Sequence, residues 1–302
     1  MMRTNAAAAG AVVAAFCCGC KPTVDPAYVK EVDAWHQDRI ERLEADEGWL
    51  TLAGLFWLNE GGNTIGTDKS SDIVFRDVFP AGAAPAKICT VVLEGGALRL
   101  TVENGVDVRI DGKPVQRAEL KSDADESPTK LRLDALTFYV IKRGDRFGIR
   151  LKDRNSKVRR AFQGIDRYAV DPSWRVEARF EPHPEGHTLE VPTIIGGTET
   201  ERSPGAVIFE RNGVTLRLEA VQSEGSDELF YVFADQTNGK ETYGAGRFLY
   251  SDPPEGGKVR LDFNKAYNPP CAFTPYATCP LPPKGNRLAV RVEAGEKSRG
   301  HH

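Results

Sequence analysis

The sequence has no excess of charge of one sign and no long hydrophobic run, and it contains few histidines. Its 302 residues hold 40 Lys and Arg against 43 Asp and Glu. Nucleic-acid binding draws on a cationic surface that releases counterions, so this balance excludes a nucleic-acid-binding protein. A membrane span needs about 20 consecutive apolar residues, and the sequence contains no run of that length, so a polytopic membrane protein is excluded. The composition also excludes collagens and coiled coils, and the length allows two domains or one large all-β domain.

Histidine is scarce, which limits the catalytic chemistry of the chain. The sequence has 5 histidines, and none lies between residues 188 and 300. A Ser-His-Asp triad and a Cys-His nucleophile both need a histidine beside the nucleophile. His183 and His187 flank Pro184-Glu185-Gly186, so they lie on a loop, where four-residue spacing does not align two rings. We therefore predict neither a metal site nor a cofactor.

The N-terminus has the pattern of an export signal. One cation, Arg3, precedes the uncharged stretch 6–16, and the run Cys17-Cys18-Gly19-Cys20 follows. A charged start, an apolar stretch of about 7–15 residues and small residues before a break are typical of a secretory signal. We expect residues 1–19 to be the signal peptide of an exported protein of the cell envelope.

Gly19 directly before Cys20 resembles the bacterial lipoprotein signal, in which that cysteine carries the lipid. The resemblance implies that the mature chain begins at Cys20 and contacts the membrane through a lipid anchor. Cys17 departs from this signal, because an aliphatic residue is usual at that position. Cys18 is a second candidate for carrying the lipid. An ordinary cleaved signal is the other interpretation.

The rest of the chain divides into a helix and two β-rich regions. After a tether at 20–25, Asp25-Pro26 and a stripe of apolar residues three or four apart predict a helix over 26–47. An apolar segment to residue 58 should pack that helix against a sheet. We expect a small sandwich over 59–170, a second β-rich region over 171–297 and a tail at 298–302.

Turn signals between short apolar runs predict antiparallel pairing. Strand-like runs recur every 8–12 residues with no helix between them, which favours a sandwich or barrel over a doubly wound sheet. We expect hairpins at four turns, Glu94-Gly95-Gly96, Asp111-Gly112, Arg143-Gly144-Asp145 and Asn212-Gly213. The fold class is therefore mainly β with one N-terminal helix. A further strand is expected over 288–292.

Part of the first β-rich region resembles forkhead-associated sandwiches. The resemblance lies in Ile65-Gly66-Thr67-Asp68, Ser71-Asp72-Ile73-Val74-Phe75 and 108–115. It implies the fold of a small sandwich. That family binds phosphothreonine partly through a Ser-x-x-His pair, and no histidine lies between His36 and His183, so the activity is not implied.

The segment 262–283 differs from the rest of the chain. It contains six prolines, two cysteines and two tyrosines, and proline holds an irregular path at low entropic cost. Together with 48–58 and 241–250, this segment resembles the uncharacterised bacterial and archaeal family DUF1684. The resemblance covers nearly the whole mature chain, and it implies no reaction and no catalytic residue.

Cys271 and Cys279 lie within that segment. In an exported protein they would be oxidised, and a short closed loop would gain about 2–3 kcal/mol. A disulfide is our first prediction; a metal pair or reactive thiol, and two buried unpaired thiols, are the alternatives. Cys89 lies alone in an apparent strand and is expected in the core.

The predicted ligand site is a polar and aromatic pocket for a small anion or a sugar-like molecule. We expect it to be lined by Arg247, Asn264, Tyr267, Asn268 and Tyr276. Arg247 could bind a carboxylate or phosphate in bidentate geometry, or could equally be tied internally to Asp262 or Asp235.

Two other functions stay open at this stage. One is a hydrolase that uses Asp262 or Glu241 as its base, and the other is a scaffold without a ligand. A basic run over 152–160 is expected to be a solvated face, or else an anion or membrane contact. The sequence does not indicate the oligomeric state.

Overall fold

The computed structural model describes residues 24–76, 78–79 and 85–298. The predicted signal peptide 1–19 and the predicted lipid acceptor Cys20 lie outside the described residues. Within the described ranges, none of the helices combines the length and the apolar character that a membrane span requires.

The N-terminal helix α1 spans Pro26–Glu44, and the Asp25 side chain caps it by accepting from the backbone N–H of Ala27. Its buried face includes Tyr28, Val32 and Leu43, three of the stripe that predicted it. The helix ends three residues before the expected limit. After it the chain turns tightly at Gly48, where a Cβ would lie 2.3 Å from the Leu43 carbonyl oxygen.

The first β-rich region is a sandwich of two sheets. One sheet has the order β1-β11-β10-β9-β6-β7 and the other β3-β2-β4-β5-β8. The strands of the first sheet are β1 (Leu52–Trp57), β11 (Arg146–Asp153), β10 (Leu136–Arg143), β9 (Leu131–Leu133), β6 (Arg109–Ile110) and β7 (Lys113–Pro114). Those of the second are β3 (Ile73–Val74), β2 (Gly61–Gly66), β4 (Lys87–Glu94), β5 (Ala97–Val102) and β8 (Arg117–Glu119).

Both sheets of the sandwich turn alternate side chains into one apolar core. Strand β5 shows the pattern most clearly, since its residues alternate between exposed and buried along its length. Phe138 and Ile149 of one sheet meet Val91 and Leu100 of the other in the same buried cluster. The apolar segment after α1 supplies β1, so the sandwich begins at Leu52, seven residues before the expected limit at 59.

The second β-rich region is less regular. Its main sheet has the order β16-β15-β12-β19, beside the two-stranded pairs β13-β14 and β17-β18. The strands are β12 (Arg175–Pro182), β13 (Thr188–Pro192), β14 (Thr198–Arg202), β15 (Gly205–Arg211), β16 (Val214–Glu219), β17 (Leu229–Phe233), β18 (Arg247–Ser251) and β19 (Lys258–Asp262). The short helices of the chain are α2 (Lys157–Ala161), η1 (Trp49–Thr51), η2 (Pro172–Trp174), η3 (Phe263–Lys265), η4 (Pro270–Ala272) and η5 (Lys284–Asn286).

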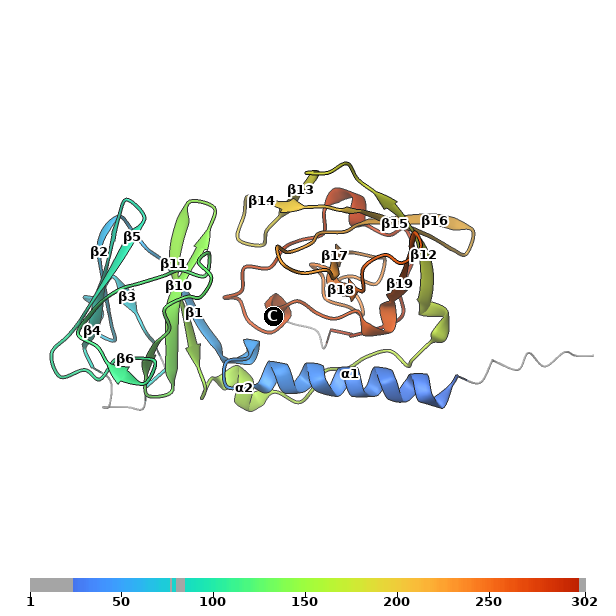
Figure 1. Cartoon of the computed structure of the whole chain (residues 1–302). Coiled ribbons are helices and arrows are strands. Elements are labelled where there is room, and N and C mark those ends of the chain that lie inside the picture. The colour runs from blue at the N-terminus through green and yellow to red at the C-terminus, as the bar shows by residue number, and fades with distance from the viewer. Residues whose placement is uncertain (1–23, 77, 80–84, 299–302) are drawn as a thin grey trace, which may run out of the picture.

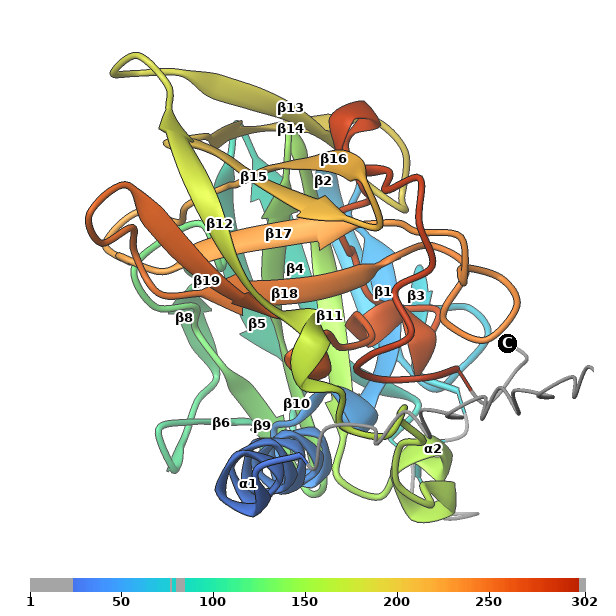
Figure 2. The same ribbon diagram turned by 90° about the vertical axis from the view of Figure 1, so that its right-hand side faces the viewer.

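The helix α1 runs along the second β-rich region, while the sandwich forms the other end of the molecule (Figure 1). Figure 2 shows α1 end-on beneath that region, with α2 to one side. Tyr28 of α1 donates a hydrogen bond to Asp262, and Arg39 donates to the Asn268 carbonyl. The helix is thus bonded to the segment 262–283 across more than two hundred residues of sequence.

The predicted fold class, mainly β with an N-terminal helix, is confirmed. All four predicted hairpins form, and Asn212 and Gly213 have the positive φ angles of 53° and 76° that their tight turn requires. The strand expected over 288–292 is absent from the described residues. Its backbone instead bonds to an irregular turn, because Leu288 N–H donates to Ala234 and Val292 N–H to the Asp235 carboxylate.

Candidate functional site

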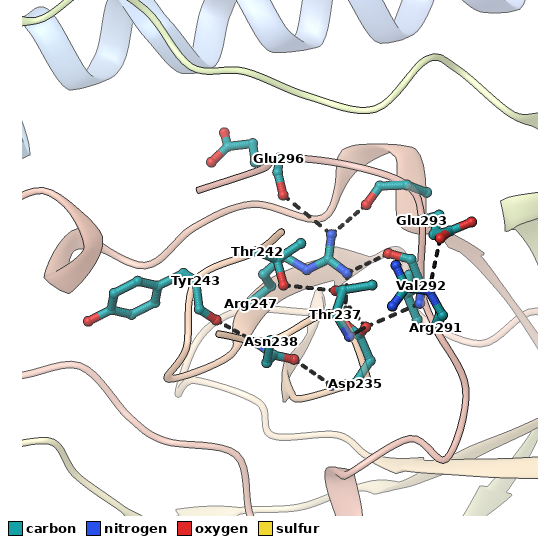
Figure 3. A network of polar contacts seen from close by, with 11 residues as sticks. Asp235, Thr237, Asn238, Thr242, Tyr243, Arg247, Arg291, Val292, Glu293 and Glu296 are labelled. Atoms are coloured by element: carbon teal, nitrogen blue, oxygen red, sulfur yellow. Dashed lines mark hydrogen bonds and ion pairs between the residues drawn. The ribbon is translucent and has the colours of Figure 1, made fainter. Parts of the chain in front are cut away.

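Arg247 lies at the start of β18 and its side chain is completely buried. Its guanidinium forms an ion pair with Asp235, with Nη2 2.8 Å from Oδ2. It also donates to the carbonyl oxygens of Val292, at 2.8 Å, and Ala294, at 2.5 Å (Figure 3). The sequence left open whether Arg247 binds a ligand or is tied to an internal carboxylate, and in the structure it is tied to Asp235.

Asp235 in turn organises the loop between β17 and β18. Its Oδ1 accepts from the Thr237 backbone N–H at 2.8 Å and from the Thr237 hydroxyl at 2.6 Å. The hydroxyl of Thr237 lies 2.8 Å from that of Thr242, and Asn238 donates to the Tyr243 carbonyl (Figure 3). Arg247 and Asp235 together therefore fix this loop against the C-terminal segment that carries Val292.

The loop and the C-terminal segment form two walls of a cavity of about 890 Å³. The other walls come from α2 with the residues that follow it, and from the segment 262–283. The lining residues are Lys157, Val158, Ala161, Phe162, Gln163, Gly164, Ile165, Gly239, Lys240, Thr242, Tyr243, Gly244, Asn268, Ala272, Phe273, Lys297 and Ser298. We call this the lysine cavity. Its volume is typical of a small-molecule site.

The lysine cavity is cationic. Three lysines line it, Lys157, Lys240 and Lys297, and none of the described lining residues is acidic. Neither the Lys157 nor the Lys240 ammonium group has a hydrogen bond or ion pair to a described residue. The Lys297 ammonium lies 4.5 Å from the centre of the Tyr168 ring. The nearby Glu241 carboxylate acts on Lys240 only through its charge, since it is paired with Arg291, so no ion pair within the described residues neutralises the lysines of the cavity.

Aromatic rings form the apolar part of the lysine cavity. Phe162 and Phe273 pack edge to face, with ring centres 6.2 Å apart. Tyr243 donates from its hydroxyl to the Cys271 carbonyl at 3.1 Å, and burial raises the pKa of Tyr243. Cys271 and Cys279 form a disulfide, which closes the loop that carries Phe273. The rings thus sit on a wall held by a covalent link.

Asn268 is the predicted site residue that lines the lysine cavity. Its backbone N–H donates to Glu296, and its backbone oxygen accepts from Arg39. Glu296 is itself 1% exposed and pairs with Arg39, with Nε 3.4 Å from Oε1. Burial raises the pKa of Glu296, and the nearby Arg39 opposes that shift. This second buried pair positions Asn268 from the side of α1.

The other predicted site residues lie elsewhere. Asn264 is buried and donates to Tyr28 and to the Asp171 carbonyl. Tyr267 lines a separate cavity of about 350 Å³ beside α1, and Tyr276 is 39% exposed and lines none of the cavities described. The five residues predicted to share one pocket therefore lie in five different environments.

The two candidate bases are also outside the lysine cavity. Asp262 is buried, accepts from the Tyr28 hydroxyl at 2.8 Å and caps η3 by accepting from the Asn264 backbone N–H. Glu241 forms a 2.6 Å ion pair with Arg291, which holds the pKa of Glu241 below its usual range. A lowered pKa makes this carboxylate a weaker base.

Sequence reasoning missed most of the cavity. Lys157 lies in the basic run 152–160, which pointed to an anion contact as one interpretation. Lys240, Phe162 and Lys297 stand alone in the sequence, and no local pattern joins them.

The loop histidines lie away from the lysine cavity. His183 bonds to Glu219 at 2.7 Å, and no group of three or more potential metal ligands occurs among the described residues.

Comparison with known proteins identifies the family. The family model "Protein of unknown function (DUF1684)" matches residues 160–297. The solution NMR structure of an uncharacterized protein of Haloarcula marismortui is 32% identical over 48% of this chain and 81% of its own length, with a TM-score of 0.41. No match was found among curated proteins.

Two further solved structures are forkhead-associated domains. One is the FhaA domain complexed with the intracellular domain of another protein, and the other comes from work on phosphothreonine-dependent interactions. Each is 18% identical over 32% of this chain, with a TM-score of 0.22, and they cover 97% and 92% of their own lengths. The family match agrees with the resemblance seen in the sequence, and the chain belongs to the DUF1684 family.

Proposed function

We propose that the protein binds a small organic anion in the lysine cavity. The observation that carries this proposal is the pairing of three lysines with no acidic side chain among the described lining residues. Lys157 and Lys240 keep their ammonium groups free of ion pairs to described residues, so an incoming carboxylate or phosphate need not displace an internal partner. Attraction in a concave site is stronger than on an open surface.

The apolar lining suggests that the anion carries a larger body. Phe162, Tyr243 and Phe273 supply ring surface, and the volume of about 890 Å³ far exceeds what a bare inorganic ion fills. Ligand sites combine apolar walls with a few polar groups that set the orientation. A phosphorylated or carboxylated molecule with several carbon atoms would use both kinds of surface.

The experiment measures phosphate and phenyl phosphate binding by isothermal titration calorimetry on the full chain. We expect phenyl phosphate to bind more tightly than inorganic phosphate, and both affinities to fall as salt is raised. Lys157→Met with Lys240→Met should weaken both about fivefold or more, since an exposed ion pair contributes up to about 1 kcal/mol.

Lys284→Met serves as the matched control, because Lys284 is exposed on η5 and does not line the cavity. This variant should bind both probes as the unchanged protein does. Equal binding by the double lysine variant would show that the cavity is not the anion site. Failure of the unchanged protein to bind either probe would leave the scaffold interpretation.

The hydrolase alternative finds less support. Asp262 is buried in a bonded network with Tyr28, and Glu241 is paired with Arg291. Neither carboxylate lines the lysine cavity. A bound anion would therefore have no general base beside it from either candidate, and binding without turnover is the simpler function.

We further propose that the protein works outside the cytosol, anchored through a lipid on Cys20. The sequence pattern before Cys20 supports the anchor, and the Cys271–Cys279 disulfide suits an oxidising compartment. Cys20→Ser should move the protein from the membrane fraction to the soluble fraction of cells. Unchanged fractionation would rule out this anchor, while Cys18→Ser tests the rival acceptor.

A further inference from the structure

A second cavity lies where the sandwich meets the second β-rich region. It has a volume of about 360 Å³, and its lining combines the cations Lys142 and Arg143 with the carboxylates Glu199 and Glu201. The cations belong to β10 of the sandwich and the carboxylates to β14 of the second region (Figure 1). We call this the junction cavity. Its volume is within the range of small-molecule sites, which are common between domains.

The two glutamates project from the inner face of the β13–β14 pair. Glu199 lies opposite Val191 and Glu201 opposite Leu189, and directly opposite residues share one face of a sheet. Val191 is buried and lines the junction cavity, so this is the face that the cavity meets. Neither glutamate side chain bonds to a described residue, and none of their carboxylate oxygens is enclosed by protein. Both are therefore open to a ligand.

This placement of charge is unfavourable for the protein alone. An antiparallel strand at the surface normally turns its charged side chains to solvent, whereas β14 turns Thr200 outward and its glutamates inward. Burial and the neighbouring Glu199 both raise the pKa of Glu201. The two carboxylates thus repel each other in a half-buried position. A cation between them would relieve this repulsion.

The sandwich side of the junction cavity carries the opposite charge. Arg143 donates from Nε to the Thr278 hydroxyl at 3.1 Å and from Nη1 to Asp123 at 2.9 Å. Its Nη2 has no hydrogen bond to a described residue and is not enclosed. Arg150 is 3% exposed, donates to the same hydroxyl and has no ion pair to a described residue, so it adds positive potential. No ion pair joins either arginine to the glutamates.

We infer that the junction cavity binds a free α-amino acid with a large apolar side chain. The ammonium group of this ligand lies at Glu199 and Glu201, and its carboxylate at Nη2 of Arg143. Its side chain packs on Phe230 and Phe248, which line the cavity with ring centres 4.9 Å apart. A simple anion would meet the glutamates and a simple cation the arginines, so a zwitterion matches the lining better than either.

The inference does not depend on the proposed function, because the junction cavity shares no lining residue with the lysine cavity. The test compares three ligands that carry the same ring. L-phenylalanine has both charges, phenethylamine lacks the carboxylate, and 3-phenylpropionate lacks the ammonium group. Titration calorimetry is performed on the unchanged chain and on Lys157→Met with Lys240→Met, which removes two cations of the lysine cavity.

L-phenylalanine should bind both proteins at least about tenfold more tightly than either analogue, because each analogue loses one charge-assisted contact. Analogues that bind as tightly as phenylalanine, or absence of phenylalanine binding, would overturn the inference. Phenylalanine that binds the unchanged chain but not the lysine variant belongs to the lysine cavity, which also overturns it. Phosphate binding decides the proposed function separately.

A second variant assigns the ammonium contact. Glu199→Gln with Glu201→Gln keeps the size of both side chains and should weaken phenylalanine about tenfold, while 3-phenylpropionate binds no more weakly than before. Glu190→Gln is the matched control, since Glu190 is exposed on the adjacent strand and does not line the cavity. Unchanged phenylalanine affinity in the double glutamine variant overturns the assignment. If that variant fails to fold, the comparison of the three ligands still decides the inference.

Discussion

The two β-rich regions of this protein differ in how they bury charge: Arg150 and Asp153 of the sandwich are buried without an ion pair to a described residue, whereas the second region buries a paired cation and carboxylate. The sandwich of β1–β11 is built around one apolar cluster that joins both sheets, with Phe138 and Leu100 among its fully buried members. The second region also has an apolar cluster, yet it additionally buries Arg247 with Asp235. The pair Arg39–Glu296 lies buried where α1 meets it.

The difference teaches where a cavity can form. Regular strands satisfy their backbone groups in sheet pairing and pack closely. In the second region the loop before β18 and the segment after η5 lie outside the strands. The Arg247 guanidinium pairs with the Asp235 carboxylate of the loop and donates to the carbonyl oxygens of Val292 and Ala294 in the segment. The irregular chain leaves space, and the lysine cavity occupies it. The buried charges thus position the cavity walls without lining the cavity themselves.

The largest effect should come from removing the buried cation. Arg247→Met leaves Asp235 buried without its partner, which should cost about 3–5 kcal/mol in the free energy of unfolding. The cavity walls meet at this residue, so phosphate binding should be lost as well. Urea unfolding followed by circular dichroism measures the first effect, and calorimetry the second.

The size of this loss decides whether Arg247 is structural. A variant that folds with a cost below about 1 kcal/mol would contradict the role of the ion pair. Lys284→Met, an exposed cation of the same region, is the control and should leave stability within about 0.5 kcal/mol.

An apolar truncation in the sandwich should cost about as much stability but spare the ligand. Leu100→Ala removes a side chain that is 1% exposed, and such changes cost about 2–5 kcal/mol. Because Leu100 is in the sandwich core and lines no wall of the lysine cavity, phosphate affinity of the folded variant should not change. A weakened phosphate affinity would show that the sandwich core and the lysine cavity are coupled, and that the two regions are not independent.

The thiols of the two regions should differ in reactivity. Cys89 is buried in the sandwich, and burial raises the pKa of its thiol to about 12, so it should resist alkylation until the chain unfolds. Cys271 and Cys279 should be labelled only after reduction. Breaking their disulfide should cost about 2–3 kcal/mol, given the short loop that it closes.

Peptide mapping by mass spectrometry locates each label and thus excludes signal from the cysteines near the N-terminus. Labelling of Cys271 without reductant would show that the pair is a dithiol. Labelling of Cys89 in the folded protein would place it outside the core.

The sandwich was largely predictable from sequence, and the cavity was not. Asn212-Gly213 and Asp111-Gly112 specify their hairpins locally, because positive φ angles favour these residues. Arg247 has its partners at 235, 292 and 294, and nothing in its neighbourhood shows that Asp235 would be the closest carboxylate. Tight turns are local chemistry, whereas a buried ion pair depends on the whole fold.

The same reasoning explains the candidate site. The segment 262–283 stood out in the sequence by its composition, and its Asn268, Ala272 and Phe273 line the cavity. The lysines come from three distant positions that only the fold brings together. Composition could suggest an anion, but it could not say which cations would meet it.

The smallest effect concerns pH and one lysine of the sandwich. Lys152 at the end of β11 donates to the Glu47 carbonyl, and burial lowers its pKa to about 8 from an ordinary 10.5. Between these values the unfolded chain binds more protons than the folded one, so stability should rise with pH across that window. From pH 7.5 to 8.5 the gain should be below about 1 kcal/mol. Urea unfolding at both values measures it.

Lys152→Met should abolish this gain, whereas Lys113→Met, at an exposed position of the same sheet, should keep it. Glu296 in the second region has the opposite sign: its pKa is raised in the folded state, so its contribution to stability is lost as pH rises through that value. The acid side and the alkaline side of the stability curve thus report on different regions. If the Lys152→Met protein still gains stability above pH 8, the alkaline pH dependence does not come from Lys152 and does not report on the sandwich.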